Sequence, residues 1–203
     1  MSVQQLKEVI LASGSVTRAQ MLEAAGVAPR VVPPDVEERP VKVKLASTRA
    51  RAETVAATLA ELKAVAVSRL HSEALVIGAD QVLDCDGKLF DKPSSADVAK
   101  RHLRELRGKR HRLVTAAAVA VDGLVTWRHV STATLTMRVF SDVFLDAYLA
   151  QAGDAVLSSV GAYQIEGLGA QLFSKVDGDH FTILGLPLFP LLEHLRQAGA
   201  IRS

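Results

Sequence analysis

The sequence has little cysteine, few aromatic residues and no long apolar run. Its 203 residues include one cysteine, Cys85, so a disulfide framework within the chain is excluded and a reducing compartment suits it. No apolar run approaches the roughly 18 residues of a membrane span. The apolar stretch near the N-terminus is too short for a signal peptide. We therefore expect a cytoplasmic protein.

The charge balance does not favour nucleic acid as a partner. The formal net charge is +2, from 24 basic and 22 acidic residues, and aromatic residues make up only 4% of the chain. Such a chain offers few stacking platforms for single-stranded nucleic acid. Basic residues do gather between Lys100 and Arg112, a run more typical of a solvated helix end than of a polyanion site. We expect neither nucleic acid nor membrane among the partners, and nucleic-acid binding through this run is the weakest alternative.

Several common catalytic motifs are absent. There is no G-x-x-x-x-G-K-[ST] and no dinucleotide-binding G-x-G-x-x-G. Neither H-E-x-x-H nor C-x-x-C occurs, and the scattered histidines do not suggest a metal site. The lack of G-x-S-x-G argues against a hydrolase with a serine nucleophile. Any chemistry must come from a less familiar arrangement of side chains.

Turn signals and apolar periodicity predict helices that alternate with strands, with a hairpin in the middle of the chain. Asp122-Gly123 is the strongest hairpin signal, and a second tight turn is expected at Asp86-Gly87. We predict a mixed α/β fold with a partly antiparallel sheet, in a single domain over residues 1–203. The other expected strands are residues 8–13 and 73–80 and one among the glycine turns of residues 161–179. The expected helices are residues 15–25, 41–67, 94–107, 141–151 and 186–197.

The stretch "LASGSVTR" joins the first predicted strand to the first predicted helix. Ser13, Gly14 and Ser15 would place free backbone N–H groups at the start of a helix, which suits an anion. Arg18, one turn later, could add a bidentate contact to phosphate. The alternative is a serine N-cap beside a solvated arginine.

Acidic residues and a lysine offer a second set of polar groups. Asp80 directly follows a predicted buried strand, where an unpaired charge would be costly, and Lys92 leaves the hairpin that begins near it. Glu38 lies in an acidic, proline-stiffened loop. Each has an ordinary alternative, as a turn residue, a surface lysine or a solvated loop. Together they have the chemistry of polyphosphate hydrolysis, because carboxylates hold a divalent cation and basic groups offset phosphate charge.

These residues lie in stretches that resemble the Maf family of nucleotide pyrophosphatases. The matches, in order, are "LASGSVTR", "RAETVA", "VIGADQVLDCDGKLFDKP", "GAYQIEGLGAQLF" and "ILGLPL". The resemblance implies a fold similar to the inosine triphosphate pyrophosphatases, with an elongated mixed sheet, flanking helices and a cleft between two lobes. It also implies hydrolysis of a nucleoside triphosphate to the monophosphate and pyrophosphate, a divalent cation (Mg²⁺ or Mn²⁺), and a homodimer.

The resemblance assigns roles by position. It makes Asp80 the catalytic base, with Lys92 and Glu38 beside it, and it gives Glu38 and Asp80 as metal ligands. An unperturbed aspartate is a weak base, so Asp80 could instead orient the metal or its water. Val16-Thr17 departs from the family, and we expect an arginine to replace the family's long-helix lysine. The expected substrate-binding residues are Ser13, Ser15, Arg18, Arg51 (or Arg49 in its place), Gln81 and Glu166.

Two family branches differ in substrate. Gln81 and Glu166 resemble the branch that acts on 7-methyl-GTP, whereas the branch acting on dTTP and UTP has Thr and Gln there. A carboxylate at Glu166 could accept hydrogen bonds from guanine N1–H and N2–H₂. We therefore expect a house-cleaning pyrophosphatase that prefers 7-methyl-GTP. The alternative of another class is a regulator of septum formation that binds nucleotide without turnover.

Overall fold

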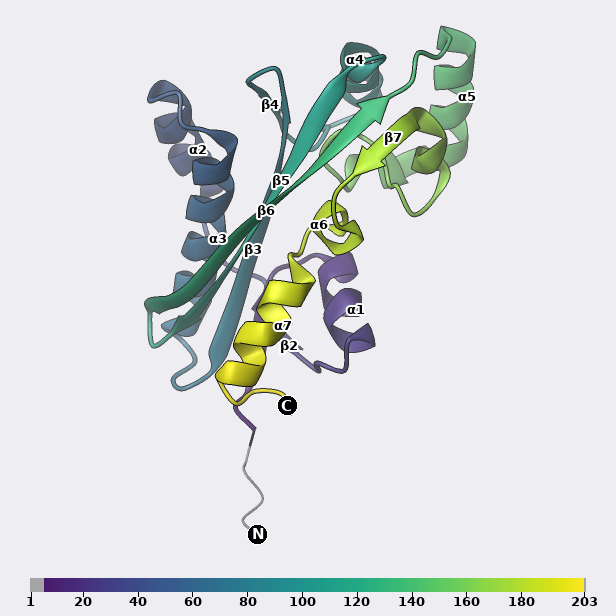
Figure 1. The fold of residues 1–203 in the computed structure, drawn as a ribbon. Helices are drawn as coiled ribbons and strands as arrows, with labels where there is room; N and C mark the ends of the chain where they lie inside the picture. The colour runs from purple at the N-terminus through teal and green to yellow at the C-terminus, as the bar shows by residue number, and fades with distance from the viewer. Residues whose placement is uncertain (1–5, 203) are drawn as a thin grey trace. The chain divides into compact units, whose positions relative to one another are not determined.

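The structure, a computed structural model, describes residues 6–202. The helices are α1 (Val16–Ala24), α2 (Glu38–Ser47), α3 (Ala52–Ser68), α4 (Ala96–Leu106), α5 (Asp142–Ala152), α6 (His180–Leu184) and α7 (Leu188–Gln197), with 3-10 turns η1 (Gly153–Leu157) and η2 (Leu168–Leu172). The strands are β1 (Val9–Ala12), β2 (Arg30–Val31), β3 (Leu75–Cys85), β4 (Lys88–Phe90), β5 (Arg110–Val121), β6 (Leu124–Met137) and β7 (Phe173–Asp177) (Figure 1). No helix among these is long and apolar enough to cross a membrane.

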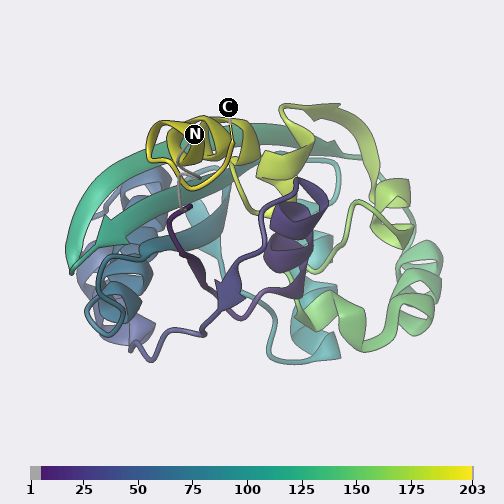
Figure 2. The same cartoon turned by 90° about the horizontal axis from the view of Figure 1, so that it is seen from below.

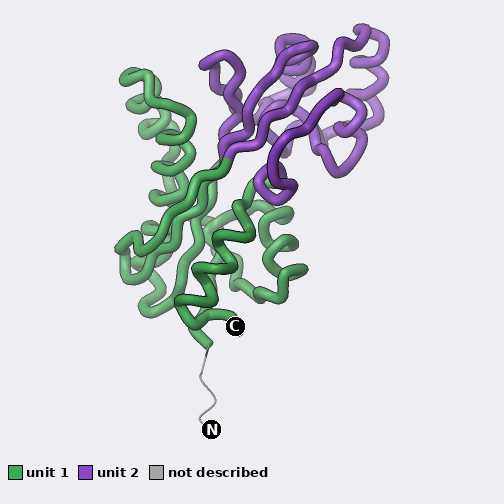
Figure 3. The backbone as a smooth tube through the Cα atoms, in the orientation of Figure 1, with its two compact units in different colours: residues 1–80, 115–131, 184–203 green, residues 81–114, 132–183 purple. Residues whose placement is uncertain are grey.

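The strands form one mixed sheet, which confirms the predicted fold class. Their order is β2-β1-β3-β5-β6-β7, and β4 pairs with β3 off this path. Strand β1 pairs in parallel with β2 and β3, whereas β4 on β3 and β7 on β6 are antiparallel. The chain divides into two compact units (Figure 3). The first contains the residues up to 80, 115–131 and those from 184 onward, and the second contains residues 81–114 and 132–183.

In the first unit, helices cover both faces of the sheet. Neighbouring strand residues point to opposite faces. On β6, Trp127 stacks on His194 of α7 with ring centroids 5.0 Å apart, whereas Arg128 forms a 3.0 Å ion pair with Glu61 of α3. Helices α3 and α7 therefore lie on opposite faces, as Figure 2 shows. Part of the apolar core joins β1, β3 and the end of α3 through Ile10, Ala12, Val67, Ala74 and Val76.

The second unit has its own core. Side chains from α4 and α5, including Leu103, Leu106 and Leu145, pack against Leu83 of β3 and Leu135 of β6. Both helices begin within two residues of their predicted starts. Their N-cap serines, at 95 and 141, accept hydrogen bonds from the backbone three residues later.

Both predicted glycine hairpins are present. Asp86-Gly87 and Asp122-Gly123 have positive φ at both central residues, which is the conformation of a type I′ hairpin turn. The short helix α6 and the two 3-10 turns were not predicted. They are too short to show a helical period.

The long helix predicted over residues 41–67 is wrong, because two helices occupy this region. α2 ends at Ser47, and α3 starts after Arg51. Between them, Arg49 adopts φ +51°, a left-handed conformation that no helix continues. Helix-forming composition on both sides hides this break from the sequence pattern.

The position of Asp80 also differs from the prediction. The strand does not end at residue 80, since β3 runs on to Cys85 by pairing with β4. Asp80 therefore lies in the middle of a buried strand and not in a turn after it.

Candidate active site

A glycine on β3 brings a lysine of α3 beside Asp80. A Cβ at Gly78 would lie 2.2 Å from the carbonyl oxygen of Ala60 and 2.6 Å from the nitrogen of Ala64, so only glycine lets α3 approach this closely. Lys63 lies on the same helix face as Ala60 and Ala64, and its side chain runs along the contact. Its Nζ donates to Oδ1 of Asp80 at 2.6 Å.

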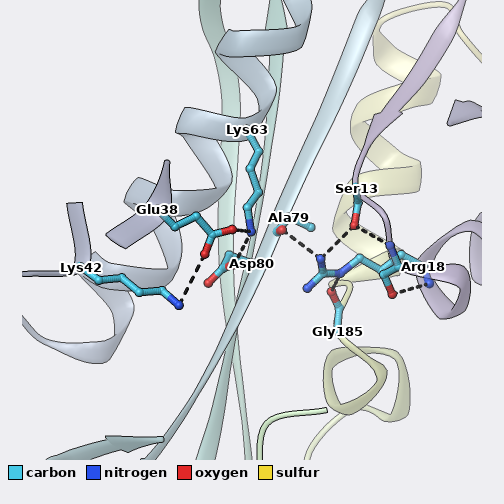
Figure 4. A network of polar contacts seen from close by, with 9 residues as sticks. Ser13, Arg18, Glu38, Lys42, Lys63, Ala79, Asp80 and Gly185 are labelled. Carbon is cyan, nitrogen blue, oxygen red and sulfur yellow. Dashed lines mark hydrogen bonds and ion pairs between the residues drawn. The ribbon is translucent and has the colours of Figure 1, made fainter. Parts of the chain in front are cut away.

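Two carboxylates share this lysine. Lys63 Nζ also lies 2.8 Å from Oε1 of Glu38, which comes from the first turn of α2. The second oxygen of Glu38 forms a looser 3.4 Å ion pair with Lys42, one turn further along α2. The result is a row of alternating charges, Asp80–Lys63–Glu38–Lys42 (Figure 4). We call these four residues the charge row.

The two carboxylates of the charge row differ in burial and in acidity. The side chain of Asp80 is 12% exposed, whereas that of Glu38 is 32% exposed. Burial raises the pKa of Asp80 above its ordinary value, against the opposing effects of Lys63 and Arg18. Burial alone would also raise the pKa of Glu38, but Lys63 and Lys42 together hold it below the ordinary value. The two carboxylates are thus driven in opposite directions.

A second polar group lies at the junction of β1 and α1. Ser13 is buried, and its Oγ accepts hydrogen bonds from Ser15 N and Arg18 Nη1, both at 3.2 Å. Ser15 is the N-cap of α1 and accepts from Arg18 N at 3.4 Å. The capping alternative is therefore confirmed for Ser15, and its hydroxyl serves the helix.

Arg18 binds three oxygens of the protein itself. Its Nε donates to Gly185 O at 2.7 Å, and its Nη1 donates to Ala79 O at 3.0 Å as well as to Ser13 (Figure 4). Burial lowers the pKa of this guanidinium, whereas the charges of Asp80 and Glu38 act to raise it. Arg18 is therefore not the solvated surface arginine of the alternative hypothesis. It ties the β1–α1 junction to β3 and to the turn before α7.

The charge row has the donor chemistry for a divalent cation. One oxygen of Asp80 and one of Glu38 already converge on a single cationic group, the ammonium of Lys63. Two carboxylates, completed by water and substrate phosphates, are a usual set for Mg²⁺. Among residues 6–202, no group of three His, Cys, Asp or Glu side chains could hold a metal without such help. Glu38 and Asp80 thus fit a metal that arrives with its substrate.

Comparison with known proteins identifies the family. A family model described as "Maf-like protein" matches residues 8–198. The chain belongs to the Maf family. It is 55% identical to a nucleoside triphosphate pyrophosphatase of Paramagnetospirillum magneticum, over 95% of this chain and 99% of that protein. It is 49% identical to a 7-methyl-GTP pyrophosphatase of Mesorhizobium japonicum, over 96% and 98%. A nucleoside triphosphate pyrophosphatase of Granulibacter bethesdensis is 46% identical, over 96% and 98%.

In this Maf family member, sequence reasoning missed Lys63. The expected arginine substitute, Arg51, occupies the N-cap position of α3 without a capping hydrogen bond. Its side chain is 81% exposed and forms an ion pair with Glu53. The structure does not bring Arg51 into the charge row, and Arg49 lies in the exposed break between α2 and α3. The lysine that lies between Glu38 and Asp80 is Lys63 of α3. The sequence held a signal for it, because a lysine on the apolar stripe of a helix needs a buried partner.

The remaining predicted residues of this Maf protein belong to the second unit. Gln81 uses its amide Nε2 to hold the carbonyls of Thr182 and Ile183 in α6, at 2.9 and 3.1 Å. Lys92 is exposed between β4 and α4, and Glu166 is exposed in the turn before η2. Gly169 makes that turn possible, since a Cβ there would lie 2.4 Å from Gln164 O. Binding of substrate by these three side chains stays a prediction.

Proposed function

We propose that this protein hydrolyses a nucleoside triphosphate to the monophosphate and pyrophosphate. The observation that carries the proposal is the pair of carboxylates, Asp80 and Glu38, held on either side of the buried Lys63. A buried ion pair contributes little to stability by itself, so its presence on a core strand needs another reason. The activities named for the relatives, which align over nearly the whole chain, support the same reaction.

In the proposed reaction, Asp80 accepts a proton from the water that attacks the α-phosphorus. An ordinary aspartate is a poor base at neutral pH, but burial raises the pKa of Asp80 and brings it closer to the working range. Lys63 keeps the carboxylate pointing along the charge row and opposes the build-up of negative charge during attack. Figure 4 shows the second oxygen of Asp80 pointing away from Lys63, which leaves it a direction in which to meet water.

The β1–α1 junction supplies the phosphate side. Nε and Nη1 of Arg18 hold protein oxygens, so a phosphate contact would use Nη2. A Cβ at Gly14 would meet no atom within 4 Å, so the backbone here is open to a close ligand. We infer that Ser13, Ser15 and Arg18 shape this junction and that its backbone N–H groups and one guanidinium edge meet phosphate oxygens.

Mg²⁺ or Mn²⁺ would be held by Glu38 and Asp80 together with substrate phosphates, and would supply charge neutralisation and a more acidic water. To hold the metal, Glu38 and Asp80 must both be ionised when the substrate arrives. Lys63 and Lys42 favour ionisation of Glu38 by lowering its pKa.

We propose 7-methyl-GTP as the preferred substrate, with UTP, CTP or dTTP as poorer ones. Glu166 carries this part of the proposal, because a carboxylate can accept from guanine N1–H and N2–H₂ and suits a cationic, methylated ring. Relatives named for 7-methyl-GTP support it, at 46–49% identity. The test is kcat/KM for 7-methyl-GTP and dTTP in the wild type and Glu166→Gln. A wild type that prefers dTTP by about tenfold, or about 1.4 kcal/mol in transition-state binding, would overturn the substrate but not the reaction.

The reaction itself is tested by pyrophosphate release from a panel of nucleoside triphosphates, with Mg²⁺ and with Mn²⁺. We expect release of one pyrophosphate per monophosphate in the presence of either metal. Nucleotide binding without any turnover would favour the regulator of septum formation instead. The expected homodimer and cytoplasmic location also stay proposals, the first of which light scattering on the purified protein tests.

A further inference from the structure

Helix α2 lies on the surface of the first unit. None of its ten residues is buried. A helix of this length has marginal stability alone in water, so its contacts with the rest of the first unit decide its position. Those contacts include the 2.8 Å pair between Glu38 and Lys63 of α3. The helix also carries three basic residues, Arg39, Lys42 and Lys44, against one acidic residue, Glu38.

Glu38 is shared unequally by its two lysines. Lys63 lies 2.8 Å from one of its oxygens with a side chain only 10% exposed, whereas Lys42 lies 3.4 Å from the other oxygen and is 38% exposed. The longer, more exposed contact is the weaker one, because water screens it. An anion that competes with Glu38 for these two lysines therefore takes Lys42 before Lys63.

The charge row is balanced before a nucleotide arrives. Its two carboxylates and two ammonium groups sum to zero, and a triphosphate adds several negative charges to it. Lys42 is the one cation of the row that sits on a helix without buried residues, at the exposed end. A lysine ammonium on a flexible stem can change partner from carboxylate to phosphate without moving the backbone.

We propose that Lys42 is a further phosphate-binding residue. Its ammonium group moves from Glu38 to the phosphate oxygens of the nucleotide, and then binds those of the pyrophosphate product. This inference rests on the proposed function and adds a residue to it. The exchange is also useful to the reaction, since it frees an oxygen of Glu38 as phosphate charge arrives. Glu38 keeps Lys63, so the carboxylate stays ionised throughout.

The chain contains a matched control for this residue. Lys44 lies on the same helix, two positions further along, and consecutive helix residues are about 100° apart. Its side chain is exposed and thus points away from the face that carries Lys42 and Glu38. Lys42→Ala and Lys44→Ala each remove one positive charge from α2, so they differ only in where the charge was.

The experiment measures binding and turnover in both variants and in Lys42→Arg. Inorganic pyrophosphate is titrated calorimetrically into each protein, and kcat and KM are measured with the best nucleotide. For Lys42→Ala we expect the Kd of pyrophosphate and the KM of the nucleotide to rise about tenfold each. This factor corresponds to the free energy of one charge-assisted hydrogen bond. We expect Lys44→Ala to stay within about twofold, because a distant exposed charge is screened. Lys42→Arg should keep most of the affinity.

The inference is overturned if Lys42→Ala binds pyrophosphate as the wild type does, or if Lys44→Ala weakens binding as much. Equal weakening would show a general effect of charge on α2. A wild type that turns over no nucleotide would instead reject the proposed function, and the pyrophosphate titration would still report on Lys42. Thermal melting of each variant checks that the fold is kept.

Discussion

Two aspartates, Asp80 and Asp84, lie four residues apart on the same strand. Each residue, backbone included, is only 8% exposed. Asp84 has both carboxylate oxygens bound: Oδ1 accepts from Gly87 N at 2.9 Å, and Oδ2 pairs with Arg112 of β5. These partners belong to the hairpin and the neighbouring strand that Asp84 holds together. Asp80 pairs with a lysine that it shares with a second carboxylate.

The difference shows how the partners of a buried carboxylate distinguish a structural role from a catalytic one. Arginine cannot lose its proton near neutral pH, and its planar group fits a carboxylate in a fixed geometry. The pair between Asp84 and Arg112 is therefore a structural ion pair at any pH near neutral. Asp80 has a pKa raised by burial and a partner that serves two carboxylates, an arrangement that leaves its ionised form under-compensated. Such a group does not stabilise the strand, so its presence there points to a role in the reaction. The predictions below test this contrast, from the largest expected effect to the smallest.

The first prediction compares the two aspartates directly. Asp80→Asn is nearly isosteric, so we expect the fold to be kept and turnover to fall by about 10²–10⁴ through loss of the base. Asp84→Asn should keep kcat within about threefold and instead lower the stability by about 2 kcal/mol, because it weakens a charge-assisted pair. Pyrophosphate release and urea unfolding measure both. Loss of turnover in Asp84→Asn, with normal turnover in Asp80→Asn, would reverse the assignment.

The second prediction removes the shared lysine. Lys63→Met removes the cation that Asp80 and Glu38 share and leaves Glu38 only its looser pair with Lys42, which should cost about 3–5 kcal/mol of unfolding free energy. Adding Asp80→Asn to this variant should recover part of the loss, since one of the two stranded charges is then gone. Urea unfolding of the single and double variants gives the coupling. A single variant as stable as the wild type would show that Lys63 does not compensate the carboxylates.

The third prediction separates two cations expected to meet phosphate. Arg18→Ala should destabilise the protein by about 2 kcal/mol as well as slow turnover, because three protein oxygens lose a charged donor. A solvated arginine, the alternative that the sequence left open, would have cost almost no stability when removed, and the contacts of Arg18 contradict that alternative. Lys92→Ala should slow turnover with almost no change in stability, since Lys92 is exposed. Equal melting temperatures for the two variants would refute the distinction.

The fourth prediction concerns pH. Because the native pKa of Asp80 is raised above 3.8, the native state binds the proton more tightly than the unfolded chain does. Ionised Asp80 therefore costs stability, and this cost appears as the pH rises from about 3.8 through the raised pKa. The melting temperature of Asp80→Asn relative to the wild type should increase over that window, while wild-type turnover increases over the same window. A constant difference between the two proteins would mean that the pKa of Asp80 is not raised.

Much of the fold could be predicted from local patterns. Serine caps, glycine hairpins and apolar strands identified most elements because each is a short-range signal. The sequence also pointed to Asp80 and Glu38 as partners. It could not show that β3 continues beyond Asp80, since the hairpin that extends it pairs residues whose register depends on the folded sheet.

Lys63 was missed for a related reason. A lysine among the apolar residues of its helix signals a buried partner, but only the packed structure shows that this partner is Asp80. Arg18 was misjudged in the other direction. Its three acceptors, at residues 13, 79 and 185, are distant in sequence, and two of them are backbone carbonyls that no residue type reveals.

The close contact at Gly78 has a consequence for how this protein can vary. Alanine is elsewhere the mildest of replacements, yet here one added methyl group would have to push a whole helix outward. That movement would withdraw Lys63 from Asp80 while every charged side chain remained in the sequence. The reactive groups could thus be uncoupled by a neutral change at a residue that carries no side chain at all. Retention of the activity therefore depends on the absence of a side chain at residue 78 as much as on the charged groups nearby.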